Sequence, residues 1–417
     1  MSNILLAFIV LKLGKDLFES YLSSRNRTYY RNIANQEHAK KTLGISDTDF
    51  SKILAYTEDK FAYGRVTTWI HMLVLLAFIV LGGFAVLEGM ARSFALGNGY
   101  GEIASGLVFF GLFAILNTLY SLPFEYYQTF KIEEKHGFNR QTLKGFWSDK
   151  VKGSVLTLVM GGAFLYVILY VMESGSYWWL LAWAATALFG VLVSWIYPTL
   201  LAPLFNKFSE LPEGELRSAI NGLAKKVDFK TSGIYVMDAS KRSTHGNAYF
   251  TGLFGEKRIV LFDTLLESLT PTETVAVLAH ELGHFKLHHV RVGLIRSIVM
   301  MGLLFFALSL CKPMEPFYKA FGFGGVSNYG ALVVFSLWYG IVGFVLTPLQ
   351  AWLSQRNEFA ADAFAKQNMN GAEELSTALV KLQKRNQSMP LTDPSFSFFY
   401  YSHPPLLQRL AALKKGA

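Results

Sequence analysis

Long stretches of this chain carry no charged side chain. Five runs of about 20 residues or more contain no Asp, Glu, Lys or Arg: residues 66–87, 103–124, 153–172, 174–206 and 320–355. A helix that crosses the hydrocarbon core of a bilayer needs about 20 apolar residues, because it rises 1.5 Å per residue through about 30 Å. The pattern therefore predicts a membrane-spanning helix in each run.

Two further segments are weaker candidates for a span. Residues 297–311 form a shorter apolar run, flanked by Arg296 and Lys312, whose long side chains can reach the membrane surface. Residues 2–11 are also apolar, but charged residues follow directly from Lys12 onward. We therefore expect six spans and a weaker seventh at the N-terminus.

The composition supports a membrane protein. Of the 417 residues, 52% are hydrophobic and 15% aromatic, and only 17% are charged. Soluble domains carry about 25% charged residues, and disordered chains, collagens and coiled coils need fewer apolar residues or a strict repeat. The single cysteine, Cys311, excludes an internal disulfide framework and a cysteine-rich metal site. We predict a mainly α, polytopic membrane protein.

Basic residues gather in alternate loops. Residues 21–65 hold eight Lys or Arg and residues 125–152 hold six, whereas the opposite loops hold only Arg92, Lys312 and Lys319. Short basic loops stay in the cytoplasm, so both basic loops are predicted to face it. The net charge of +9 then reflects membrane orientation, and we expect no nucleic-acid partner.

These assignments divide the chain into four predicted parts. Spans one to five with the two cytoplasmic loops occupy residues 1–206, a cytoplasmic insert occupies 207–296, spans six and seven occupy 297–355, and a cytoplasmic C-terminal segment occupies 356–417. Residues 214–227 of the insert have the periodicity of an amphipathic helix.

The insert also has the pattern of a small sheet followed by a helix. Residues 234–237 and 258–262 predict short strands, and residues 247–252 predict an edge strand between them. A helix is expected to begin at Pro271, with Thr270 as its cap, and to run towards the span at 297–311.

The main chemical signal lies on this helix, in the sequence His280-Glu281-Leu282-Gly283-His284. Helical positions i and i+4 share a face, so both imidazoles can reach one metal ion. Zinc suits such ligands and keeps one coordination position open, and it lowers the pKa of water so that Glu281 can accept the proton. The alternative is a solvated helix with chance histidines, a match expected in about one chain in a hundred. We predict one Zn²⁺ per chain.

A third ligand is expected after the last span. The metzincin continuation fails, because Leu287 and Val290 stand where it needs glycine and histidine, and His288 lies too far along the helix to be a ligand. Glu358 and Asp362 share a helical face. Glu358 can complete a His–His–Glu site, and Asp362 can accept a hydrogen bond from a zinc-binding histidine or assist the leaving amine. The alternative is an ordinary charged helix end.

A further candidate is His403, which lies in Ser-His-Pro-Pro and is followed by Arg409. It is either a buried loop histidine or a donor near the oxyanion of a tetrahedral intermediate.

Taken together, these residues resemble the CAAX prenyl endopeptidases, which are membrane-embedded zinc metalloproteases of the gluzincin type. The resemblance covers most of the chain. Besides the three segments just described, it includes residues 132–142, 196–198, 202–207, 240–243, 247–250 and 258–266.

The resemblance implies seven transmembrane helices around an internal chamber, with the zinc site at its cytoplasmic end. It assigns His280, His284 and Glu358 to zinc, Glu281 to the general base, and Asp362, His403 and Arg409 to supporting catalytic roles. It also suggests that Asn247, Ala248 and Tyr249 bind the substrate backbone, since an edge strand can pair with an extended peptide. The alternative for these three residues is a sheet edge without function.

The reaction implied is removal of a C-terminal tripeptide after a prenylated cysteine. A membrane-protein quality-control protease with the same chemistry is a second hypothesis. A transporter or non-catalytic scaffold is a third, but it predicts ionisable residues within the spans. A site-two type protease would need an Asp-Gly pair, which the sequence lacks.

The expected partners are the lipid bilayer and a peptide or protein substrate, prenylated or not. The expected location is a bacterial inner membrane or, in a eukaryote, the endoplasmic reticulum membrane, with the zinc site facing the cytoplasm.

Overall fold

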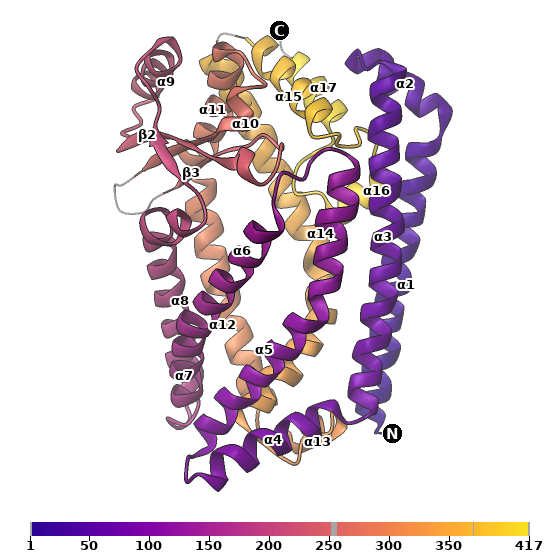
Figure 1. The fold of residues 1–417 in the computed structure, drawn as a ribbon, viewed down its shortest axis with the longest axis vertical. Coiled ribbons are helices and arrows are strands. Elements are labelled where there is room, and N and C mark those ends of the chain that lie inside the picture. The colour runs from indigo at the N-terminus through magenta and orange to yellow at the C-terminus, as the bar shows by residue number, and fades with distance from the viewer. Residues whose placement is uncertain (1, 252–256, 370, 416–417) are drawn as a thin grey trace.

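The computed structural model describes residues 2–251, 257–369 and 371–415, which fold into helices and one small sheet. Long helices run along the long axis of the molecule, and the sheet and most of the shorter helices gather at one end (Figure 1). The N-terminal helix α1 (Asn3–Arg31) begins at the opposite end. We call the end that contains the sheet the polar end, and the opposite end, where α1 begins, the far end (Figure 1). The membrane helices connect the two.

Six helical segments of the described chain are long and apolar enough to cross a membrane. They are Asp47–Val80, Glu102–Glu133, Leu143–Val171, Trp178–Leu204, His289–Cys311 and Asn328–Asn368. The predicted mainly α, polytopic fold is thereby confirmed. Helix α1 has sufficient length, but it carries Lys12, Lys15, Asp16 and Glu19, so the predicted total of seven spans stays a prediction.

Three of these six segments contain more than one helical element. The elements are α3 (Asp47–Val80); α5 (Glu102–Tyr127) with η1 (Gln128–Glu133); α6 (Leu143–Leu156) with η2 (Thr157–Gly161) and α7 (Gly162–Val171); α8 (Trp178–Ile196) with η3 (Tyr197–Leu201) and η4 (Ala202–Leu204); α12 (His289–Cys311); and α14 (Asn328–Asn368). A helix of 41 residues is about 60 Å long. Helix α14 can therefore continue past a bilayer into the polar end.

Two predicted helices are interrupted. The uncharged run at 66–87 is broken where α3 ends, because Gly82 adopts the left-handed conformation with φ of 76°. Helix α4 (Gly83–Gly97) then lies across the far end of the molecule (Figure 1). The helix from Pro271 does not continue into the span, because the chain turns at His288, whose φ is 60°.

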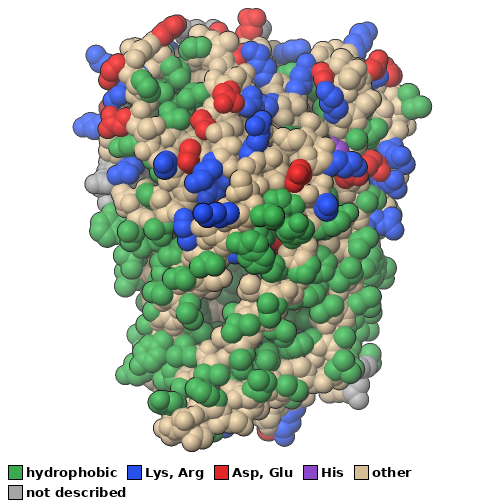
Figure 2. Space-filling view, in the orientation of Figure 1, with side chains coloured by type: hydrophobic (Ala, Val, Ile, Leu, Met, Phe, Trp, Pro, Cys, Tyr) green, Lys and Arg blue, Asp and Glu red, His purple; other side chains and the backbone are tan. Residues whose placement is uncertain are grey.

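Few residues of the spans are fully buried within the described chain. Only 6% to 17% of the residues in their most apolar windows are buried. Figure 2 shows the matching surface, with charged side chains concentrated at the polar end and a hollowed apolar belt below it. Low burial agrees with a wall of helices between lipid and an interior space, and the predicted chamber itself stays a prediction.

The polar end contains a four-stranded mixed sheet in the order β1-β2-β4-β3. The strands are β1 (Phe208–Glu210), β2 (Gly233–Met237), β3 (Ala248–Thr251) and β4 (Arg258–Phe262). β2 is parallel to β4, and both outer strands are antiparallel to their neighbours. β2, β3 and β4 follow the sequence prediction, although β3 is described only to residue 251, and β1 was missed because it has only three residues. β3 is an edge strand.

Further helices lie at the same end of the molecule as this sheet (Figure 1). They are α9 (Glu215–Lys226), α10 (Asp263–Leu266), α11 (Pro271–Lys286), α15 (Glu373–Arg385) and α17 (Leu406–Lys414). The remaining elements are α2 (Ile33–Leu43), η5 (Ala239–Lys241), α13 (Glu315–Ala320) and α16 (Pro394–Tyr400). Apolar residues from the sheet, α9, α11 and α15 form one buried core. This core fixes α11 against the sheet.

A buried carboxylate connects the elements at the far end. Glu88 of α4 accepts hydrogen bonds from the Tyr329 hydroxyl at 2.9 Å and from the Gly324 amide at 2.7 Å. Both Glu88 and Tyr329 are buried. Because Tyr329 lies in the first turn of α14, this contact holds α4 to the start of the helix that reaches the polar end.

Replacing Glu88 with leucine should destabilise the protein. The change leaves the Tyr329 hydroxyl and the Gly324 amide buried without an acceptor, which should lower the free energy of unfolding by about 2 kcal/mol. Thermal unfolding in detergent, followed by tryptophan fluorescence, measures the effect. Glu102→Leu is the control, because Glu102 forms an exposed pair with Arg92 worth at most about 1 kcal/mol. Equal losses for the two variants would contradict the structural role of Glu88.

Candidate metal centre

Helix α11 begins where the sequence predicts it. Thr270 accepts a hydrogen bond from the Glu273 amide, the Glu273 side chain accepts one from the Thr270 amide, and Pro271 takes the first helical position. This capping box satisfies two amides that a helix start would otherwise leave unpaired. A defined start fixes which positions of α11 face α14.

A glycine allows α11 and α14 to pack closely. A Cβ atom added to Gly283 would lie 3.0 Å from Cα of Ala361 and 3.2 Å from its carbonyl oxygen. Both atoms belong to the backbone and cannot move aside easily. Gly283 stands between His280 and His284 in sequence, and Ala361 stands between Glu358 and Asp362. The close approach therefore brings the two motifs together.

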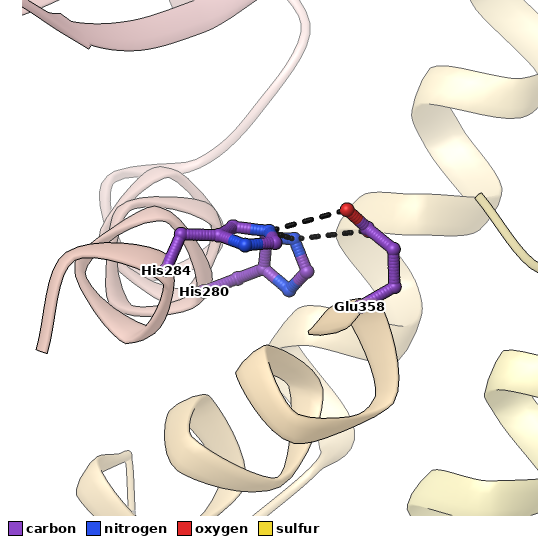
Figure 3. A group of neighbouring side chains, drawn as sticks. All are labelled: His280, His284 and Glu358. Carbon is purple, nitrogen blue, oxygen red and sulfur yellow. Dashed lines mark hydrogen bonds and ion pairs between the residues drawn. The ribbon is translucent and has the colours of Figure 1, made fainter. Parts of the chain in front are cut away.

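Three predicted ligands meet across this helix interface (Figure 3). The Nε2 atoms of His280 and His284 lie 3.2 Å apart. Glu358 places Oε2 3.4 Å from His280 Nε2 and Oε1 3.2 Å from His284 Nε2. One ligand atom from each residue lies within 4.8 Å of the others, so the three can hold a metal ion.

The donor set and its spacing fit zinc. Zinc takes histidine nitrogen and carboxylate oxygen at about 2.0–2.2 Å, usually in a tetrahedron, and ligands of such a tetrahedron lie about 3.3 Å apart. Glu358 is buried, and its Oε2 atom has no hydrogen-bond partner among the described residues. A buried carboxylate oxygen is costly unless a cation or donor compensates it. The three ligand atoms are therefore spaced for a cation, and a cation would compensate the buried Glu358 carboxylate.

Asp362 and Arg409 support the first histidine. His280 Nδ1 lies 2.8 Å from Asp362 Oδ1, and a proton donated there leaves Nε2 free as a ligand. Arg409, on α17, holds Asp362 through Nε at 2.9 Å and Nη2 at 2.6 Å. Burial alone would lower the pKa of His280, but the Asp362 and Glu358 carboxylates raise that pKa to about 9. The surroundings thus stabilise positive charge.

The second histidine contacts a residue that the sequence analysis missed. His284 Nδ1 lies 3.0 Å from His289 Nδ1. The sequence drew attention to His288, which is exposed and lies at the break between α11 and α12. Helical spacing cannot indicate His289, because the chain changes direction before it. His288 makes no contact with the ligands in the described structure.

Two other predicted residues lie beside the ligands. Burial raises the pKa of Glu281, which follows His280 directly on α11. His403 Nε2 lies 3.4 Å from Glu358 Oε1, its Nδ1 lies 2.9 Å from the Ser402 hydroxyl, and 64% of its side chain is exposed. Arg409, by contrast, is buried and engaged by Asp362. His403 is therefore accessible to a bound molecule, whereas the Arg409 guanidinium is held by Asp362.

The predicted substrate-binding residues lie at the start of β3. Asn247 precedes the strand, and its Oδ1 accepts a hydrogen bond from the Ala248 amide at 2.8 Å. Ala248 packs into the same core as α11, whereas Tyr249 packs on the other face of the sheet. None of the three forms a hydrogen bond with the ligand residues in the described structure. Among the described residues, no strand pairs with the edge of β3 that faces away from β4.

Two family models together match nearly the whole chain. Residues 29–207 match the model described as "CAAX prenyl protease N-terminal, five membrane helices", and residues 210–417 match "Peptidase family M48". The candidate ligands lie in the second region.

Individual proteins agree with the family models. The chain is 36% identical to CAAX prenyl protease 1 homolog of Mus musculus, with 96% of this chain and 93% of that protein covered. It is 35% identical to CAAX prenyl protease 1 of Saccharomyces cerevisiae, with 95% and 92% covered. The crystal structure of S. mikatae Ste24p superposes with a TM-score of 0.90 at 31% identity, covering 99% of both chains.

These similarities extend across the membrane helices, the sheet and the ligand-bearing helices alike. They confirm the resemblance that the sequence indicates, and they favour an enzyme over a transporter. The chain belongs to the CAAX prenyl protease family of membrane metalloendopeptidases, within peptidase family M48.

Proposed function

We propose that the protein binds one Zn²⁺ per chain through His280, His284 and Glu358 and cleaves peptides that carry a prenylated cysteine near the C-terminus. The main support is that the Nε2 atoms of the two histidines and the oxygens of the buried Glu358 carboxylate lie 3.2–3.4 Å from one another. The names of relatives that match almost the full chain support the substrate class.

Each residue around the ligands has a role in the proposed reaction. His280, His284 and Glu358 would hold the zinc ion, which would supply an acidified water and polarisation of the scissile carbonyl. Glu281 accepts a proton from the attacking water and transfers it to the leaving amine. Its pKa is raised and therefore lies closer to neutral pH, which suits a general base. His403 donates a hydrogen bond to the developing oxyanion. Asp362 and Arg409 keep His280 in the correct tautomer and orientation.

The free edge of β3 holds the substrate in this proposal. An extended peptide pairs with the backbone beside Asn247, Ala248 and Tyr249, and such main-chain pairing fixes a scissile bond without reading its side chains. Asn247 positions the first amide of β3 through its own side chain.

We infer that the metal centre faces the cytoplasm. The support is the concentration of Lys and Arg at the end that contains α9, α11 and α15 (Figure 2), together with the preference of short basic loops for that side. The same proposal includes the division of the chain into membrane and cytoplasmic parts at residues 206, 296 and 355.

The variant Glu281→Gln should lose activity but keep zinc. Removing a general base typically slows a reaction by about 10²–10⁴-fold, and glutamine retains the shape of the side chain. Turnover of a farnesylated peptide, measured by mass spectrometry of the products, is compared with zinc content. Glu213→Gln serves as the control, since Glu213 is 80% exposed. Wild-type turnover by Glu281→Gln would remove Glu281 from the mechanism.

The same assay tests the substrate class. A peptide with the farnesyl group should be cleaved faster than the same peptide without it, because the lipid keeps the substrate at the membrane. Faster cleavage of an unprenylated, misfolded membrane protein would instead favour quality control.

The variant Asp362→Asn should bind zinc less tightly. Loss of the carboxylate partner of a zinc-binding histidine typically reduces metal affinity by about 10–100-fold. Competition with a chelator of known affinity measures the change. Asp393→Asn is the matched control, because Asp393 is also buried but caps α16. An unchanged zinc affinity in Asp362→Asn would contradict the proposed support of His280.

Cysteine labelling should confirm the orientation. In a Cys311→Ala background, Glu213→Cys should react with a membrane-impermeant maleimide in sealed vesicles that expose the cytoplasmic face. Asn98→Cys, between α4 and α5 at the far end, should react only after detergent is added. The reverse pattern would place the metal centre on the other side.

A further inference from the structure

A polar cavity adjoins the candidate metal centre. It has a volume of about 550 Å³ and is lined by His403 and Arg409 on one side and by Tyr56 and Lys60 of α3 on another. None of the described residues that line it is acidic. Lys60 carries a positive charge, the charge of Arg409 is paired with Asp362, and His403 and His245 can donate hydrogen bonds. The cavity therefore favours an anion.

Lys60 forms no direct ion pair with a described carboxylate, although its charge acts on the nearby Glu133 carboxylate. The Lys60 Nζ atom lies 4.8 Å from the centre of the Tyr56 ring. The nearby Glu133 carboxylate is already engaged, because it accepts a hydrogen bond from the Tyr56 hydroxyl at 2.8 Å and lies 3.7 Å from His245 Nε2. The ammonium group is therefore available to a ligand.

A second, independent feature of the cavity indicates a peptide. Gln387 lines the cavity, and its buried Oε1 atom has no hydrogen-bond donor among the described residues. Gln387 directly follows the last residues of α15, and its φ of 43° belongs to the left-handed ending of that helix. A buried acceptor without a donor is expected to gain one when a ligand binds, and a peptide N–H is a suitable donor.

The sheet determines which end of a peptide enters the cavity. A peptide that pairs antiparallel with β3 points its C-terminus towards the beginning of β3, that is, towards Asn247 and then His245. His245 lines the cavity. The Gly246 amide also donates to Asn386 Oδ1 at 3.3 Å, and this bond holds the segment before β3 against the loop that contains Gln387.

We propose that this cavity binds the free C-terminal carboxylate of the substrate and that Lys60 is its cationic partner. The proposal rests on the proposed function and adds a specificity-determining residue to it. Three extended residues span about 10 Å, which is about the width of a compact cavity of 550 Å³. In this proposal the tripeptide lies between the metal centre and Lys60. Recognition of the terminal carboxylate thereby sets how many residues separate the cleaved bond from the C-terminus.

Paired peptides test the proposal. One farnesylated peptide has a free C-terminal carboxylate, and its partner has a C-terminal amide. Wild-type protein should cleave the acid with a KM about tenfold lower, the factor expected for one charge-assisted hydrogen bond. Lys60→Met should remove this preference by raising KM for the acid alone, with little change in kcat. Lys60→Arg should retain the preference, and Lys52→Met, on the exposed surface of the same helix, should leave both peptides unaffected.

Direct binding separates this proposal from the proposed function. The Glu281→Gln protein is titrated by calorimetry with the tripeptide product as acid and as amide. Tighter binding of the acid that disappears with an added Lys60→Met supports the carboxylate site, even if wild-type protein cleaves neither peptide and the proposed function fails. Equal binding of acid and amide, or equal effects of Lys60→Met and Lys52→Met, would overturn the carboxylate site while leaving the zinc mechanism intact.

Discussion

The structure depends on the contact between α11 and α14 at Gly283 and Ala361. At this point the backbones lie so close that a single Cβ atom would force them apart. At this interface the imidazoles of α11 lie within 3.2–3.4 Å of the Glu358 carboxylate. The carboxylate is buried and lacks a sufficient set of donors, so the fold tolerates it where a cation compensates its charge. Packing and metal binding are thus two aspects of one interface.

The membrane helices contribute to this interface from a distance. Helix α14 extends from its contact with Glu88 at the far end to Glu358 and Asp362 at the polar end, so one continuous helix connects both ends. Helix α11 belongs to the sheet core. The metal centre therefore forms where a membrane helix meets a soluble fold, and α17 closes the site by placing Arg409 against Asp362.

The sequence predicted the features that depend on local periodicity. The uncharged runs, the start of α11, the strands β2 and β4, and the spacing of His280 and His284 all follow from patterns within one segment. Local patterns cannot indicate where a chain turns, so the breaks at Gly82 and His288 and the contact of His289 were missed. The sequence did not indicate the cavity either, because Lys60, His245 and Gln387 are far apart in sequence and come together only in the folded chain.

X-ray diffraction from crystals of the purified protein, recorded on both sides of the zinc absorption edge, tests the central claim most directly. Our account predicts one anomalous peak per chain, within about 2.2 Å of His280 Nε2, His284 Nε2 and a Glu358 oxygen, as for catalytic zinc. A zinc peak elsewhere, or zinc-loaded crystals with no peak between α11 and α14, would contradict it.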